Sequence, residues 1–246
     1  MAELVWAPIS HVRSEVNVRI MTHRKFTEAR RLMGISASVE RRCLIWLAER
    51  LPRWVSSDHL TALALLAMFM TGLSFYLATW HRGALLLAIG WLGVNWFGDS
   101  LDGTLARVRR QQRPRYGFYV DHVIDCIGTS LLFLGLGMSG FMSPLVAIGV
   151  LAAYLLLTAE VYLATYCLTE FRMSFWGIGP TELRILLAIG TLALLSDPKV
   201  DLWGTSFRLF DVGGAIAIVL MLLTLMWSVA RNVRALYRDE PLLDGS

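Results

Sequence analysis

The sequence predicts an all-α integral membrane protein with six transmembrane helices, preceded by an amphipathic helix at the membrane interface. Hydrophobic residues make up 56% of the 246 residues and charged residues only 17%, whereas a soluble domain carries about 25% charged residues. Apolar runs close to the ~20 residues that cross a bilayer recur along the chain. They lie at 61–80, 83–96, 123–138, 143–159, 185–195 and 212–229. The fifth run reaches spanning length only if its helix begins near Thr181.

The distribution of basic residues predicts the orientation of these helices. If the N-terminus is cytoplasmic, nearly all Lys and Arg residues fall in four cytoplasmic segments: 1–57, about 107–116, about 169–184, and the region after 230. The basic residues on the opposite side are Arg82, Lys199 and Arg208. This asymmetry predicts that both termini and the connection between the second and third spans face the cytoplasm. We therefore expect a multi-pass protein of the cell (inner) membrane.

The predicted domain organisation has two parts. Residues 1–57 form a cytoplasmic N-terminal segment, and residues 58–246 form the six-helix transmembrane domain. Helical periodicity begins near residue 38 and continues to residue 51. The residues that share its apolar face are Val39, Cys43, Trp46 and Leu47. Such a helix suits an anionic membrane surface. Pro52 ends it, and Ser57 or Asp58 can cap the next helix.

Composition also argues against several classes of protein. The basic residues are explained by membrane topology and no nucleic-acid motif is present, so we expect no nucleic-acid partner. The cysteines (Cys43, Cys126 and Cys167) are odd in number and lack metal-ligand spacing, so neither a disulfide framework nor a zinc site is indicated. No apolar segment followed by a cleavage site stands at the N-terminus, which argues against secretion.

A polar stretch at residues 98–125 interrupts the apolar sequence between the second and third spans. Carboxylates buried in a membrane are costly and usually functional. Residues three and four apart share one face of a helix. One such stripe consists of Asp99, Asp102, Gly103 and Ala106, and a second, on the following helix, consists of Gly117, Asp121 and Asp125.

The two stripes predict a metal site. A short connection joins the two helix ends, so the stripes can face each other. Four converging carboxylates cannot all stay charged without a cationic partner, and hard oxygen ligands suit Mg²⁺ or Mn²⁺. A carboxylate at a helix end that reaches water is the alternative for any single aspartate, but it does not account for four on two matched stripes.

The other residues of the stripes indicate what the metal site binds. The small residues leave room for a flat group beside the backbone, and Arg107 offers a planar fork for phosphate oxygens. Metal, phosphate and planar group together predict a nucleotide diphosphate ligand. A cation channel or transporter lined by the aspartates is an alternative from another class, but it leaves Gly103, Ala106 and Gly117 unexplained.

The spacing D-x2-D-G-x2-A-R-x9-G-x3-D-x3-D, from Asp99 to Asp125, resembles the signature of the CDP-alcohol phosphotransferases, also called CDP-alcohol phosphatidyltransferases. These membrane enzymes make phospholipids from CDP-activated alcohols. All eight signature residues are present. The stretch SSDHLT before the first span resembles the family's Pro-Asn-x-x-Thr, with Ser57 and Asp58 in place of Pro and Asn. The order Asp-His-x-x-Asp, together with TELR at 181–184, is similar to the choline/ethanolamine phosphotransferase branch.

The resemblance implies a role for each matching residue. It implies that Asp99, Asp102 and Asp121 hold a divalent metal pair, and that Asp125 is both a metal ligand and the general base. The residues that would line the nucleotide site are Gly103, Ala106, Arg107 and Gly117, with Asp58 and Thr61 as further contacts. It also implies a homodimer in the lipid bilayer with a cytoplasmic active site.

Four further polar residues are candidates for an acceptor site. Glu160 lies about as deep in the fourth span as Asp99 does in the second, although an interhelical hydrogen bond explains it equally well. Arg184 and Arg172 flank the connection between the fourth and fifth spans, where they can reach a phosphate or the interface. His122 can assist proton transfer or simply pack against a neighbour.

The predicted function is the transfer of a phospho-alcohol group from a CDP-alcohol to an acceptor hydroxyl, with release of CMP. CDP-diacylglycerol is the favoured donor, with a small polar alcohol as acceptor. The alternative is a CDP-choline or CDP-ethanolamine donor with diacylglycerol as acceptor. Residues 58–246 are then the catalytic domain, and the cofactor is Mg²⁺ or Mn²⁺.

Overall fold

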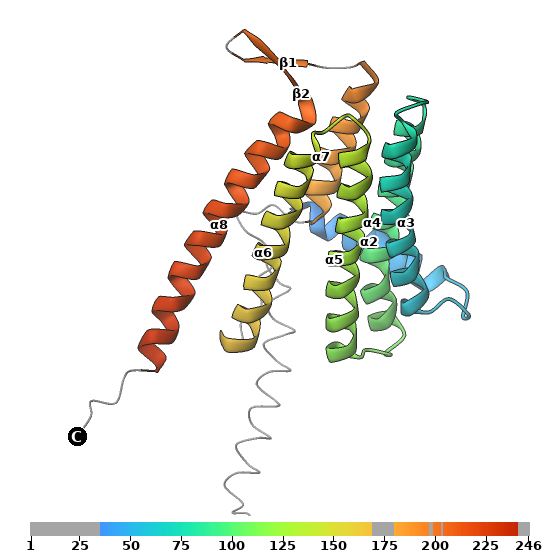
Figure 1. Ribbon diagram of the computed structural model, residues 1–246. Coiled ribbons are helices and arrows are strands. Elements are labelled where there is room, and N and C mark those ends of the chain that lie inside the picture. Colours follow the sequence, from blue (N-terminus) through green and yellow to red (C-terminus); the bar gives the residue numbers. More distant parts are fainter. Residues whose placement is uncertain (1–34, 169–179, 197–198, 203, 241–246) are drawn as a thin grey trace, which may run out of the picture.

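The computed structural model describes residues 35–168, 180–196, 199–202 and 204–240, and nearly all of them lie in helices (Figure 1). The predictions for residues 1–34 and for Arg172 lie outside these ranges. The helices are α2 (Ile35–Arg50), α3 (Ser57–Leu77), α4 (Ala84–Val108), α5 (Pro114–Met138), α6 (Pro144–Leu168), α7 (Pro180–Ala193) and α8 (Leu209–Asp239).

Among the described residues, five helices are long and apolar enough to cross a membrane: α3, α4, α5, α6 and α8. The predicted all-α membrane architecture is confirmed to that extent. The predicted fifth span corresponds to α7, which has 14 residues and belongs to a shorter apolar segment, Leu183–Ser196. At 1.5 Å per residue this helix measures about 21 Å, less than the ~30 Å hydrocarbon core. Six spans therefore remain a prediction.

The start of α3 is fixed by a capping box. The Ser56 hydroxyl accepts a hydrogen bond from the His59 amide over 3.3 Å, and His59 Nδ1 accepts one from the Ser56 amide over 3.2 Å. Two of the amides that helix formation leaves unpaired are thereby satisfied. The prediction that Ser57 or Asp58 caps this helix was wrong, because Ser57 donates instead to the backbone carbonyl of Asp102, 2.5 Å away.

Helix α3 packs against both α4 and α5. Glycine makes the closest approach possible: a Cβ atom placed on Gly135 of α5 would lie 2.1 Å from the carbonyl oxygen of Gly72 on α3. The two backbones therefore touch with no side chain between them. Such an approach fixes the position of α5, and thus of the two aspartates it carries, against α3.

A helix is present where the amphipathic helix was predicted: it is α2, which lies across the bundle rather than along it (Figure 1). Leu44 and Ala48 are buried with Leu60, Leu101 and Leu105 in a cluster that joins α2, α3 and α4. Cys43 and Trp46 are exposed on the other side, and Glu40 accepts a hydrogen bond from the Trp96 indole over 3.0 Å. Of the predicted apolar face, Leu47 packs against this cluster, whereas Cys43 and Trp46 do not. Its contact with the membrane surface stays a prediction.

A β-hairpin that the sequence reading missed connects α7 to α8. A short 3₁₀ turn (Leu194–Ser196) is followed by β1 (Lys199–Leu202), which pairs in antiparallel fashion with β2 (Thr205–Arg208). The hairpin and the α3–α4 connection lie at the end of the bundle opposite the α4–α5 connection (Figure 1). These two segments carry Lys199, Arg208 and Arg82, the three basic residues that we expected on the non-cytoplasmic side.

Candidate functional site

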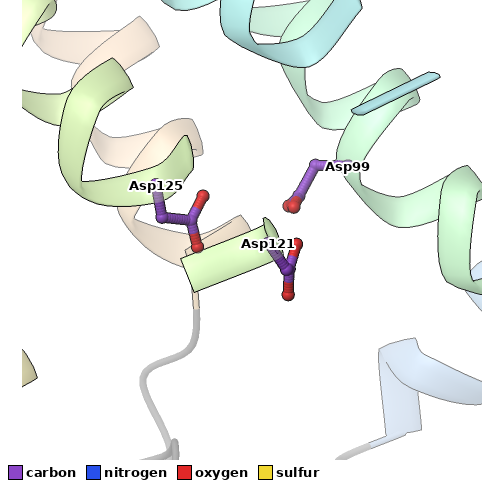
Figure 2. Close-up of side chains that lie close together, drawn as sticks. All are labelled: Asp99, Asp121 and Asp125. Carbon is purple, nitrogen blue, oxygen red and sulfur yellow. The ribbon is translucent and has the colours of Figure 1, made fainter. Parts of the chain in front are cut away.

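Three of the four aspartates converge between α4 and α5. Each of Asp99, Asp121 and Asp125 offers a carboxylate oxygen, and these oxygens all lie within 4.8 Å of one another. Figure 2 shows Asp99 on α4 facing the two aspartates on α5. All three side chains are partly buried. The helical spacing of Asp121 and Asp125 places them on one face of α5, as the sequence predicted.

Asp102 lies one turn beyond Asp99 and is held by α3. The Thr61 hydroxyl is 2.7 Å from Oδ2 of Asp102 and 3.0 Å from the carbonyl oxygen of Ser57. A hydroxyl has a single proton, and the charged carboxylate is the closer and stronger acceptor. Oδ1 of Asp102 accepts a hydrogen bond from the Gly103 amide. Thr61, predicted to contact a nucleotide, therefore orients a carboxylate of the signature.

Arg184 on α7 pairs with Asp99. Its Nη2 atom lies 2.7 Å from Oδ2 of Asp99, and the two side chains are only 18% and 23% exposed. We expected this arginine near an acceptor group. The structure places it next to the carboxylate cluster. No sequence signal indicated this pairing, because 85 residues separate the partners.

The small residues of the signature lie on α4 and α5, the two helices that carry the cluster. A Cβ atom on Gly117 would meet nothing within 4 Å, and Gly103 and Ala106 are partly exposed. Arg107 is exposed near the end of α4, and its Nη2 atom donates to the Thr104 hydroxyl over 2.9 Å. The structure therefore leaves open space at Gly117, and the nucleotide site stays a prediction.

Two arginines of the α4–α5 connection tie it to the start of α3. Arg113 donates two hydrogen bonds to Asp58, over 3.0 and 2.8 Å, and this bonding raises the pKa of the guanidinium above its usual value. Arg109 donates to backbone carbonyls of the α2–α3 connection, including those of Leu51 and Pro52 at 3.0 and 2.9 Å. The sequence reading missed both residues, which lie in a basic run that topology alone explains.

His122 lies in an aromatic cluster next to Asp121. Its ring stacks on Phe118 with the centroids 4.1 Å apart and lies 4.8 Å from the ring of Tyr162 on α6. His122 Nδ1 is 3.7 Å from Oδ2 of Asp121. The imidazole is buried, so the structure places it in packing contact and near a carboxylate at the same time.

Glu160 joins α6 to α8. Its carboxylate accepts hydrogen bonds from the Ser228 hydroxyl, at 2.9 and 3.0 Å, and from the Asn232 amide, at 2.7 Å. Ser228 and Asn232 are both buried. These contacts fit the interhelical hydrogen bond that was one of the two readings of Glu160. Its role as an acceptor residue stays a prediction.

The donor set of the cluster fits a divalent cation. Three carboxylates supply hard oxygen ligands, which are the ligands that Mg²⁺ and Mn²⁺ prefer. Arg184 supplies one positive charge against several negative ones. The arrangement can therefore hold a divalent metal ion.

Comparison with known protein families places these features in context. The family model for CDP-alcohol phosphatidyltransferase matches residues 54–230. The match begins just before α3 and ends within α8, so it includes the aspartate cluster, Thr61 and Arg184. No individual curated protein matches the chain.

Proposed function

This chain belongs to the CDP-alcohol phosphatidyltransferase family, and we propose that it transfers a phosphatidyl group from CDP-diacylglycerol to the hydroxyl of a small polar alcohol. Membership makes it an enzyme that transfers a phospho-alcohol group from a CDP-alcohol to an acceptor. The observation that carries the proposal is the convergence of Asp99, Asp121 and Asp125 within a membrane helix bundle. A cluster at this position can serve a lipid-linked donor and a water-soluble acceptor together.

Asp99, Asp121 and Asp125 are the residues that would hold Mg²⁺ or Mn²⁺, with Asp102 as the fourth signature carboxylate. A bound divalent ion supplies charge stabilisation to the diphosphate and to the departing CMP. Thr61 orients Asp102 from α3, over 2.7 Å. Arg107 binds the diphosphate, and Gly103, Ala106 and Gly117 admit the cytidine beside the backbone.

The chemical step requires a base for the acceptor hydroxyl. The resemblance to the family signature assigns this role to Asp125, one of the two aspartates that α5 contributes to the cluster. Its carboxylate takes the acceptor proton as the acceptor oxygen bonds to the donor's β-phosphorus, the one that carries the alcohol group. The bond from that phosphorus to the bridging oxygen breaks, and CMP leaves with the electron pair.

A second candidate function uses CDP-choline or CDP-ethanolamine as donor and diacylglycerol as acceptor. The observation that favours it is the cluster of Phe118, His122 and Tyr162 beside Asp121. Aromatic faces attract quaternary ammonium groups.

The proposed enzyme works as a homodimer in the cell (inner) membrane, with the α4–α5 end of the bundle toward the cytoplasm.

The experiment that separates these functions is a donor panel. Purified protein in lipid nanodiscs is supplied with Mg²⁺ and with CDP-diacylglycerol, CDP-choline or CDP-ethanolamine, each with matching acceptors, and CMP release is measured. The proposal expects release with CDP-diacylglycerol and a polar alcohol. Release only with CDP-choline or CDP-ethanolamine would establish the second candidate. No CMP release with any donor, together with metal-ion flux into liposomes that carry the same protein, would point to the channel or transporter instead.

A further inference from the structure

We propose that Arg184 is a positioning residue that shares Asp99 with the divalent metal and competes with the metal for the negative charge of the cluster. In this arrangement Arg184 holds the carboxylates together and lowers their affinity for the cation. The inference rests on the proposed metal-dependent function, and it concerns the regulation of the same site.

The ion pair between Arg184 and Asp99 is largely shielded from solvent. Nη2 of Arg184 lies 2.7 Å from Oδ2 of Asp99, with the two side chains 18% and 23% exposed. The Arg113–Asp58 pair is similar in distance, 2.8 Å, but its side chains are 58% and 49% exposed. Solvent and salt screen a buried pair much less than an exposed one. The charge of Arg184 therefore acts on the cluster with little attenuation.

The positive charge of Arg184 acts on two carboxylates of the cluster. Asp99 is one of the three residues able to hold a metal, and Arg184 also acts electrostatically on Asp125. A guanidinium does not lose its proton in proteins, so it stays cationic when a metal arrives. Two cations then draw on the same oxygens and repel each other.

Competition has a consequence for the reaction. When a divalent ion binds to the Asp99 carboxylate, the ion pair between Asp99 and Arg184 weakens. The planar fork then becomes available for an anionic group of a substrate, which it can bind through two parallel hydrogen bonds. Metal and anionic substrate are thereby coupled through one arginine at the start of α7.

The test measures Mn²⁺ binding without substrate, by isothermal titration of the purified full-length protein. Arg184→Gln removes the charge but keeps an amide that can donate to Asp99. Arg184→Lys keeps the charge and loses the fork. Arg208→Gln removes a positive charge at the opposite end of the bundle and serves as the matched control.

We expect Arg184→Gln to bind Mn²⁺ roughly tenfold more tightly than wild type, because a unit charge close to the cation is removed. Arg208→Gln should match wild type, and Arg184→Lys should stay within about threefold of it. Unchanged or weaker binding by Arg184→Gln would overturn the inference. If that variant does not fold, a change larger than about threefold in Arg184→Lys would overturn it as well.

The same titration distinguishes this inference from the proposed function. Wild-type protein that binds no Mn²⁺ would overturn the metal-dependent function and the inference together. Wild-type protein that binds Mn²⁺, with no gain in Arg184→Gln, would overturn the inference alone.

Discussion

Thr61 on α3 and Asp102 on α4 are joined by a hydrogen bond of 2.7 Å between the threonine hydroxyl and Oδ2 of the carboxylate. Thr61 is buried, with 9% of its surface exposed, and Asp102 is partly buried. The helix that precedes the signature therefore orients one of the signature's carboxylates. This relationship gives Thr61 a positioning role.

Replacing Thr61 by valine should lower the rate of transfer without unfolding the protein. Valine keeps the shape but removes the hydroxyl that donates to Oδ2 of Asp102. A hydrogen bond to a charged group contributes about 1.5–3 kcal/mol, so kcat/KM should fall roughly 10- to 150-fold. The matched control is Thr71→Val, because the Thr71 hydroxyl donates to the carbonyl of Ala67 in its own helix. Equal activity in Thr61→Val and Thr71→Val would show that Thr61 has no positioning role.

Asp125→Asn should abolish transfer while CDP-alcohol binding stays largely intact. The substitution removes the assigned base but leaves Asp99 and Asp121 in place. CMP release and equilibrium binding of a CDP-alcohol, measured on the same preparation, separate the two effects. A parallel loss of nucleotide binding would instead assign Asp125 mainly to metal retention.

Gly117→Leu should prevent nucleotide binding by steric exclusion. A Cβ atom at this position meets no protein atom within 4 Å, so the fold tolerates a side chain there. The leucine would occupy the space assigned to cytidine, and affinity for the CDP-alcohol should drop at least about tenfold. Gly90→Leu on α4, also free of neighbours within 4 Å, is the control. Normal affinity in Gly117→Leu would move the nucleotide away from this stripe.

Gly135→Ala should destabilise the bundle, although alanine is normally the better helix former. Its Cβ atom would lie 2.1 Å from the Gly72 carbonyl oxygen, so α3 and α5 would have to separate. Overpacking of this kind costs about 1–3 kcal/mol or more, and thermal unfolding in detergent should show it. Gly93→Ala, where no atom lies within 4 Å, should be neutral or stabilising. Equal stability of both variants would mean that the α3–α5 contact is looser than described.

Local periodicity and a short connection predicted the convergence of three aspartates. Asp121 and Asp125 are four residues apart on one helix, so their shared face follows from the helical repeat alone. Convergence with Asp99 followed from the short connection between α4 and α5, which forces the two helix ends together. The family resemblance is confirmed over residues 54–230. These parts depend on short stretches of chain.

The features that sequence reasoning missed depend on contacts between distant segments. The pairing of Arg184 with Asp99 spans 85 residues, and the contact of Arg109 with the Leu51 carbonyl spans 58. No periodicity encodes such pairs, because they follow from how whole helices pack. The hairpin of β1 and β2 was missed for another reason. Its two strands have eight residues together, too few to give a recognisable pattern between the long apolar runs on either side.

We propose that the carboxylates of α4 and α5 form a metal-dependent phosphotransfer centre. CMP release from CDP-diacylglycerol, measured with Mg²⁺ and with a chelator for wild type and for Asp99→Asn, tests this directly. Wild-type protein should release CMP with Mg²⁺ and lose this activity with the chelator. Asp99→Asn should be inactive at Mg²⁺ concentrations that saturate wild type. CMP release that survives the chelator, or that Asp99→Asn retains at the wild-type rate, would contradict the account.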